Sequence, residues 1–191
     1  MMHLSHNHIS SKQRTGGFTL IEMLVAVFVF SVSLAALMTV SAKGLKTGNQ
    51  SERQVIADYL AIEGVETIRN IRDSVLLSLD TVSTWQDLFD LDDCWSDQQA
   101  GIVNACSISY DNSDILLFPC DSCTVFYDDT NYLYRQFQGD VPTGGYTDTG
   151  FTREVVLTEA PTNPDELIVT VIVSWDNGRV EYTENLFLWI S

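Results

Sequence analysis

Basic residues are scarce in this chain, and their scarcity excludes one class of partner. The 191 residues contain ten Lys and Arg against 26 Asp and Glu, which gives a formal net charge of −16. Residues 80–191 hold 20 of these acids and three arginines. An acidic surface of this kind repels phosphate groups, so we expect no direct binding of nucleic acid. A solubilising role explains most of these acids.

Histidine is missing from nearly the whole chain. The three histidines, His3, His6 and His8, all precede the first long apolar segment. Histidine is the commonest general acid or base in enzymes and the base of the hydrolase triads. The sequence therefore predicts no catalytic residue, no enzyme activity and no cofactor.

Charge is also absent from residues 23–40, an apolar run of 18 residues. About 20 apolar residues in a helix span the hydrocarbon core of a bilayer, so we expect segment 18–50 to form a transmembrane helix. A helix buried wholly in a protein core is the alternative. It is less favoured because nothing interrupts or caps the run.

The charges that flank this run give a mixed signal for orientation. Lys12 and Arg14 favour a cytoplasmic N-terminus, whereas Lys43 and Lys46 lie at the other end. The short N-terminal piece is too small to be the folded domain. We therefore expect a single-pass protein of the cytoplasmic membrane, with its C-terminal head outside.

One acid, Glu22, lies near the start of the apolar segment. An unpaired acid in hydrocarbon costs at least about 2.5 kcal/mol, so its presence there is a functional hypothesis. A secretory signal peptide has small residues after its apolar run, but here Gly16 and Gly17 precede the run. Cleavage between Gly17 and Phe18 would create an amino group about one helical turn from Glu22. The two charges would then offset each other's desolvation, within one molecule or between neighbours.

Residues 16–22 have the sequence Gly-Gly-Phe-Thr-Leu-Ile-Glu and lead directly into the apolar run. This pattern resembles the class III signal of type IV prepilins and pseudopilins. The resemblance implies that residues 1–17 are a leader removed by a prepilin peptidase at the cytoplasmic face. It implies that Phe18 becomes the N-methylated first residue and that Glu22 acts in assembly. An ordinary N-terminal anchor with the same pattern is the alternative.

The resemblance also implies the partners and the final location of the protein. Besides the peptidase, the expected partners are membrane lipid and other pilin or pseudopilin subunits. The processed protein would leave the membrane for a pilus-like filament, which is extracellular or periplasmic.

A second helical pattern follows residues 43–49, where Gly44 and Gly48 form a weak point. We expect an amphipathic helix over residues 51–79, with Ser51 and Gln54 as a capping box. Its stretch 57–73 resembles the helix that follows the membrane segment in many prepilin-like proteins, and a helix packed on a sheet also fits. The expected stripe, with spacings of three and four, consists of Val55, Tyr59, Ile62, Val65 or Glu66, Ile68 or Arg69, and Arg72.

The remainder of the chain favours β-structure. Residues 80–100 are polar and acidic, and we interpret them as a loop or a short helix around 85–89. The sheet is expected in residues 101–191, and Asp176-Asn177-Gly178 is a typical hairpin turn between its two strongest strands. A helix followed by antiparallel strands is an α+β order, here of the type IV pilin-like kind. The predicted strands are 101–110, 115–118, 124–127, 132–137, 151–158, 167–175 and 179–190.

The C-terminal segments 151–157, 169–175 and 186–189 resemble the end of minor pilins of the pilus-modification type. Alternating strands that end in Trp occur in many sheet proteins, so this half alone names no family. Together with the N-terminus it favours a minor subunit over a major pilin.

The four cysteines all lie in the predicted head. An even count in an oxidising compartment predicts two disulfides, with three possible pairings. Because short loops close most readily, we favour Cys94 with Cys106 and Cys120 with Cys123. A zinc site is the alternative, but only Cys120 and Cys123 have suitable spacing. The same pair lacks the βαβ setting of a thioredoxin-like redox motif.

Clusters of acids offer oxygen ligands for calcium at 87–97, at Asp111 with Asp114, and at Asp128 with Asp129. None has the spacing of an EF-hand loop, so we predict no metal site.

Two roles for the protein remain open. It is either a structural subunit that joins or primes a filament, of a pilus or of a type II secretion system, or an anchored or filament-displayed module that binds a surface or a substrate through its acidic loops.

Overall fold

The computed structural model describes residues 16–77, 85, 94–96, 104–111 and 114–187. The chain divides into two compact units, Met1–Gly48 and Asn49–Ser191. One helix, α1 (Leu20–Leu77), supplies residues to both units. The two units are described in turn.

The first unit contains the apolar part of α1. Thr19 caps the helix, because its carbonyl oxygen accepts hydrogen bonds from the backbone N–H groups of Glu22 and Met23 and its hydroxyl accepts from Glu22. Further along, the hydroxyls of Ser31 and Thr39 donate to carbonyl oxygens four residues earlier. These bonds satisfy the polar groups of an otherwise apolar helix.

The expected weak point at residues 43–49 does not interrupt the helix. α1 is helical through Gly44 and Gly48, so Ser51 lies inside the helix and the predicted capping box at its start is wrong. Each internal glycine costs about 1 kcal/mol of helix propensity, but extending an existing helix needs no new nucleus. Extension of α1 through this segment therefore outweighs the low helix propensity of the two glycines.

In the second unit, the buried face of α1 coincides only in part with the predicted one. Val55, Tyr59 and Ile62 are 52%, 70% and 42% exposed, so this part of the predicted stripe is wrong, whereas Val65 and Ile68 are buried as predicted. The buried face is built around small residues that allow the helix to approach the sheet closely. A Cβ on Gly64 would lie 2.9 Å from Cγ1 of Val171. The buried residues of α1 are Ala57, Leu60, Ala61, Gly64, Val65, Thr67 and Ile68.

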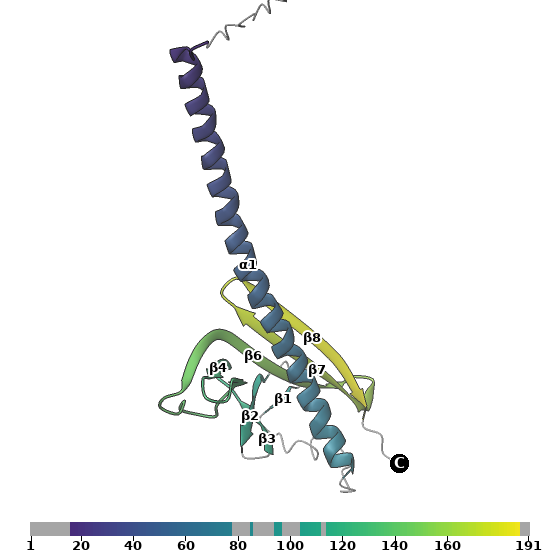
Figure 1. Ribbon diagram of the computed structural model, residues 1–191. Helices are drawn as coiled ribbons and strands as arrows, with labels where there is room; N and C mark the ends of the chain where they lie inside the picture. The colour runs from purple at the N-terminus through teal and green to yellow at the C-terminus, as the bar shows by residue number, and fades with distance from the viewer. Residues whose placement is uncertain (1–15, 78–84, 86–93, 97–103, 112–113, 188–191) are drawn as a thin grey trace, which may run out of the picture. The chain divides into compact units, whose positions relative to one another are not determined.

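The described residues form one sheet of eight strands. Figure 1 shows its arrangement with α1. The predicted strands all find counterparts, although residues 101–103 of the first predicted strand and residues 188–190 of the last lie outside the described residues. The strand bounds are β1 (Trp95–Ser96), β2 (Cys106–Asp111), β3 (Asp114–Pro119), β4 (Thr124–Asp128), β5 (Leu133–Arg135), β6 (Tyr146–Ala160), β7 (Asn163–Trp175) and β8 (Gly178–Phe187).

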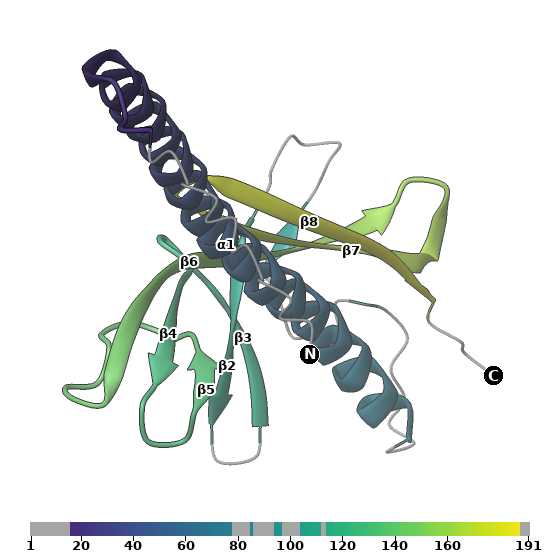
Figure 2. The ribbon, with the colours of Figure 1, turned by 45° about the horizontal axis from the view of Figure 1, so that its top comes forward.

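The long strand β6 organises the sheet, and Figure 2 shows it bending between its partners. On one edge it pairs with β4 through Thr152, with β2 through Val155 and with β1 through Leu157. The same three residues pair with β7 on the other edge. The pairing with β1 is parallel and all others are antiparallel. Strand β1 lies in the stretch predicted to be a loop, because two residues are too few for an alternating pattern.

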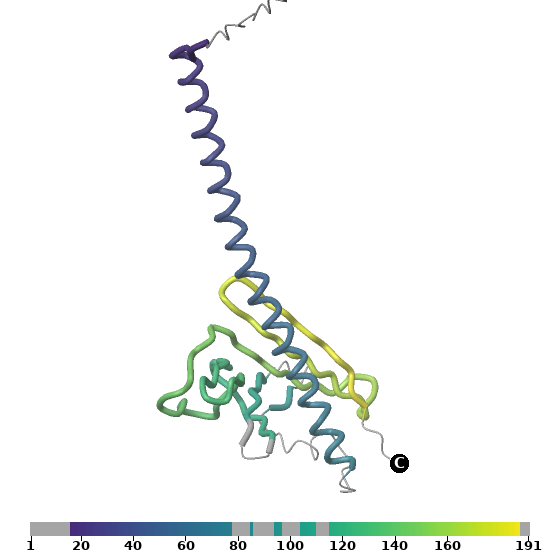
Figure 3. The backbone as a smooth tube through the Cα atoms, in the orientation of Figure 1, coloured from purple at the N-terminus to yellow at the C-terminus, as the bar shows by residue number. Residues whose placement is uncertain are grey.

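The hairpin of β7 and β8 runs beside α1 (Figure 3). Its turn consists of Asp176 and Asn177, as the sequence predicts. Gly178 follows the turn, where a Cβ would lie 2.2 Å from the indole of Trp175. Only glycine therefore fits beneath this ring.

The core lies between α1 and the inward residues of β6 and β7. Alternate positions of these strands are buried, as expected for a sheet with one covered face. Trp85 is also buried, at 2% exposure. The predicted α+β class, with a long N-terminal helix packed on an antiparallel sheet, is thus confirmed. The core strand residues include Val155, Leu157, Val169, Val171 and Val173.

Candidate functional site

The predicted cleavage site lies just before α1. Gly16 and Gly17 are exposed and outside regular secondary structure, and a Cβ at either position would meet nothing within 4 Å. Phe18 is 77% exposed. The segment is therefore open to another protein, and the helix begins only after it.

Glu22 lies in the first turn of α1 and is exposed. An acid in the first turn interacts favourably with the positive end of the helix dipole. Among the residues that the structure describes, no ion pair involves Glu22. Glu22 thus lies in an apolar segment, and no cationic side chain of the described residues pairs with its carboxylate.

The head contains two disulfides, Cys94–Cys106 and Cys120–Cys123, with Cα atoms 5.7 and 5.0 Å apart. This is the pairing that the short-loop argument favours. All four cysteines are described and none is free, which leaves no thiolate for zinc. The first bond joins the residue before β1 to β2, and the second closes the short connection between β3 and β4.

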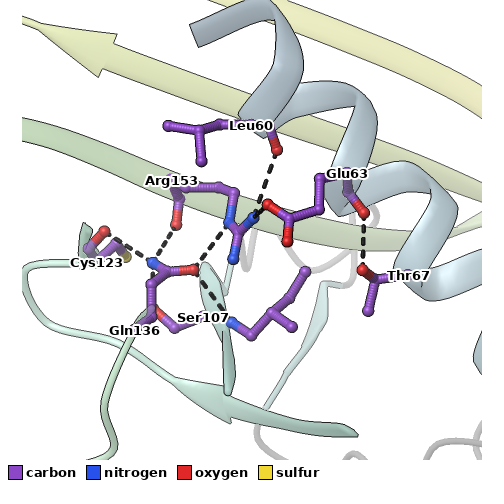
Figure 4. Close-up of polar contacts among 8 residues, drawn as sticks. Leu60, Glu63, Thr67, Ser107, Cys123, Gln136 and Arg153 are labelled. Atoms are coloured by element: carbon purple, nitrogen blue, oxygen red, sulfur yellow. Dashed lines mark hydrogen bonds and ion pairs between the residues drawn. The ribbon is translucent and has the colours of Figure 1, made fainter. Parts of the chain in front are cut away.

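A buried polar cluster around Arg153 joins α1 to the sheet (Figure 4). Arg153 is 0% exposed although it lies on β6. Its Nη1 donates to Oε2 of Glu63 at 2.9 Å, and its Nε donates to Oε1 of Gln136 at 3.0 Å. The side-chain amide of Gln136 donates in turn to Ser107, Cys123 and the carbonyl oxygen of Arg153.

The sequence analysis missed this cluster. One pattern in the sequence does indicate that Arg153 is buried. In the alternating strand β6, Arg153 lies on the same face as Phe151 and Val155, which are both buried. A buried charge is costly unless it is paired and hydrogen-bonded, and here Glu63 supplies the opposite charge. The cluster fixes the helix on the sheet and offers no open reaction centre.

Asp128, one of the acids considered above as a calcium ligand, is hydrogen-bonded within its own turn. Its carboxylate accepts bonds from Asn131, from the backbone of Thr130 and from Nε of Arg135. These bonds, the one from the Asn131 side chain foremost, hold the pKa of Asp128 below its usual value. Most of cluster 87–97 and the side chains of Asp111 and Asp114 lie outside the described residues. Elsewhere in the described chain no group of three or more His, Cys, Asp or Glu could hold a metal.

A family model for the prokaryotic N-terminal methylation motif matches residues 12–38. The chain carries a type IV prepilin-like N-terminus. The match covers the predicted cleavage site, Glu22 and most of the apolar run. Searches of curated proteins and of solved structures find no match to the chain.

The motif and the fold together support a type IV pilin-like or pseudopilin subunit. The motif implies processing by prepilin peptidase and assembly with other pilin subunits. The helix α1 is long and apolar enough to cross a membrane, and none of its apolar window is buried within the described structure. Motif and helix thus indicate a membrane-anchored pilin-like protein, as predicted.

Proposed function

We propose that this chain is the precursor of a minor pilin or pseudopilin. Residues 1–17 are the leader, residues 18–50 the membrane and assembly helix, and residues 51–191 the exported head. Prepilin peptidase cuts between Gly17 and Phe18, and Phe18 is then N-methylated. The processed subunit joins or primes a filament of the pilus or secretion type.

The observation that carries this proposal is the arrangement of residues 16–22. An open Gly-Gly segment precedes a helix that is capped at Thr19 and has Glu22 in its first turn. After cleavage, the new amino group of Phe18 would stand about one turn before Glu22. In hydrocarbon each charge needs the other, in the same molecule or in a neighbouring subunit.

The proposed orientation rests on the folded head and its disulfides. The head has a folded core and two disulfides, which form and persist in an oxidising compartment. We therefore place residues 51–191 outside the cytoplasmic membrane, and later on an extracellular or periplasmic filament. Displayed there, the acidic head is also open to a second role as a binding module.

Cleavage is tested by changing the residue before the cut. Gly17→Leu adds a bulky side chain to the open segment and is expected to leave the precursor uncut. Intact mass of the membrane-extracted protein measures the result. Gly44→Leu, the same change in an exposed part of α1, is the control and should be processed normally. Wild-type amounts of protein starting at Phe18 in Gly17→Leu would contradict the leader assignment.

A further inference from the structure

The two disulfides of the head differ in their access to solvent. Cys94 and Cys106 are 1% and 0% exposed and belong to the core that packs around α1. Cys120, by contrast, is half-buried, and the two residues that follow it, Asp121 and Ser122, are exposed. The first bridge is therefore closed to solutes in the folded head, whereas the second lies at its surface.

An open cavity of about 210 Å³ lies beside the second bridge, within the second unit. Both Cys120 and Cys123 line it, together with Phe126 and Phe137, whose ring centroids are 5.9 Å apart. This volume is many times that needed for one water molecule, so a small thiol can enter it. The bridge can thus be reached without unfolding the head.

The backbone of Cys123 has an unfavourable conformation. Its φ is 50°, which lies in the left-handed region that side chains with a Cβ rarely adopt. Its carbonyl oxygen accepts hydrogen bonds from Nε2 of Gln136 at 2.8 Å and from the N–H of Arg153 at 2.9 Å. These bonds and the bridge to Cys120 hold Cys123 in place. Opening the bridge removes one of these constraints and loosens an acceptor of the buried Arg153 cluster.

We propose that Cys120–Cys123 is a site of thiol–disulfide exchange in the folded head, and that its reactant is a dithiol. One thiolate of the dithiol attacks Sγ of Cys120, since Cys123 is only 5% exposed, and Cys123 leaves as a thiolate that takes up a proton. The second thiolate of the reactant then attacks its own sulfur in the mixed disulfide and releases Cys120. The bridge gains two electrons and two protons, and the dithiol becomes a disulfide.

The charge beside the bridge selects among dithiols. Asp121 is exposed and lies in no ion pair within the described residues. Its carboxylate repels an incoming thiolate and any further negative charge on the reactant. The site therefore favours a neutral or cationic dithiol over an anionic one. This exchange goes beyond the pilin role, because it needs neither cleavage nor assembly.

Selective reduction of the full-length protein in detergent tests the site. The folded protein is treated with the neutral dithiol dithiothreitol, the free thiols are alkylated, and the labelled peptides are mapped by mass. Cys120 and Cys123 are expected to be labelled while Cys94 and Cys106 remain bridged, and all four should be labelled when urea is added. The buried bridge is thus a control within the same molecule.

Two variants locate the point of attack. Asp121→Asn removes the charge beside Cys120 and should raise the rate of reduction about two- to fivefold, because the attacking thiolate is no longer repelled. Asp165→Asn, the same change at an exposed acid near the start of β7, should leave the rate unchanged. The selectively reduced wild type should also unfold at a lower urea concentration than the oxidised protein, by tryptophan fluorescence.

The contrary results are equally definite. Equal rates for the two bridges, earlier loss of Cys94–Cys106, or no reduction before unfolding would overturn the exchange site. A rate that ignores Asp121→Asn would also overturn it, because the attack would then not occur beside Cys120. An unchanged urea midpoint after selective reduction would contradict the link to the Arg153 cluster. None of these results depends on filament formation, so the proposed function is tested separately.

Discussion

The two parts of α1 show how one helix serves two environments. Over residues 20–48 every side chain is exposed, including the large apolar Leu24, Phe28 and Met38. Over residues 49–77 one face, with Leu60 and Ile68, is buried in the core of the head. No described residue covers this first part, and its residues 23–40 carry no charge on any side. A helix of this type needs lipid or other helices.

This difference separates two kinds of dependence. The head has its own core, disulfides and polar cluster, so its stability depends on internal contacts. The first part of α1 depends on partners outside the molecule. Changes in the head should therefore alter unfolding, while changes before residue 49 should alter assembly. All four tryptophans lie at or after residue 85, so their fluorescence reports on the head of the full-length protein in detergent.

The largest effect on the head is expected from Glu63→Ala. The change removes the carboxylate that neutralises the buried Arg153 and should cost about 3 kcal/mol of unfolding free energy. Urea unfolding followed by tryptophan fluorescence measures it. Glu66→Ala removes the exposed partner of Arg69 and should cost less than about 1 kcal/mol. Equal losses in the two variants would show that Arg153 does not depend on Glu63.

A smaller effect is expected from Gly64→Leu. Even a Cβ at this position would lie 2.9 Å from Val171, so the added side chain must push the helix from the sheet, at about 1–3 kcal/mol. Gly44→Leu is the matched control on the other part of α1, where a Cβ meets nothing within 4 Å. It should leave the urea midpoint of the head unchanged. A loss in Gly44→Leu as large as in Gly64→Leu would remove the distinction between the two parts.

The smallest effect concerns Asp128 and depends on pH. Because hydrogen bonds lower its pKa in the folded state, its contribution to stability is present above the ordinary pKa of an aspartate and is lost as the pH falls through the lowered value. Asp128→Asn should therefore be slightly less stable than the wild type at neutral pH. The two urea midpoints should converge in acid, and a constant difference across this range would contradict the assignment.

The sequence predicts the fold best where local patterns are strong. The alternation in β7 and the turn at Asp176 and Asn177 carry enough information to define the last hairpin. The motif at residues 16–22 can likewise be recognised from the sequence alone, without knowledge of tertiary contacts. The phase of the helix in the head does not follow from hydrophobicity, because close packing selected Ala57, Ala61 and Gly64 over the larger Val55 and Tyr59.

The parts that sequence reasoning missed depend on distant partners. Arg153 appears in the sequence as one polar residue in an alternating strand, and its burial makes sense only once Glu63 and Gln136 lie beside it. The two-residue strand β1 likewise exists only through its pairing with Leu157 and Thr158 of β6. The alternation of β6 places Arg153 on the buried face, but it does not identify the partners of Arg153, and β1 is too short to show any period.

The central claim is that Glu22 acts between subunits and not within the head. Glu22→Val makes the helix more apolar, so membrane insertion should be retained, and it leaves the cleavage residues Gly17 and Phe18 unchanged. We expect normal amounts of processed protein in the membrane and the urea midpoint of the wild type, but strongly reduced protein in sheared filaments. The ratio of filament to membrane protein, compared between Glu22→Val and wild type, is the measurement. An unchanged ratio would show that assembly does not need Glu22, and a wild type absent from every filament would contradict the pilin assignment itself.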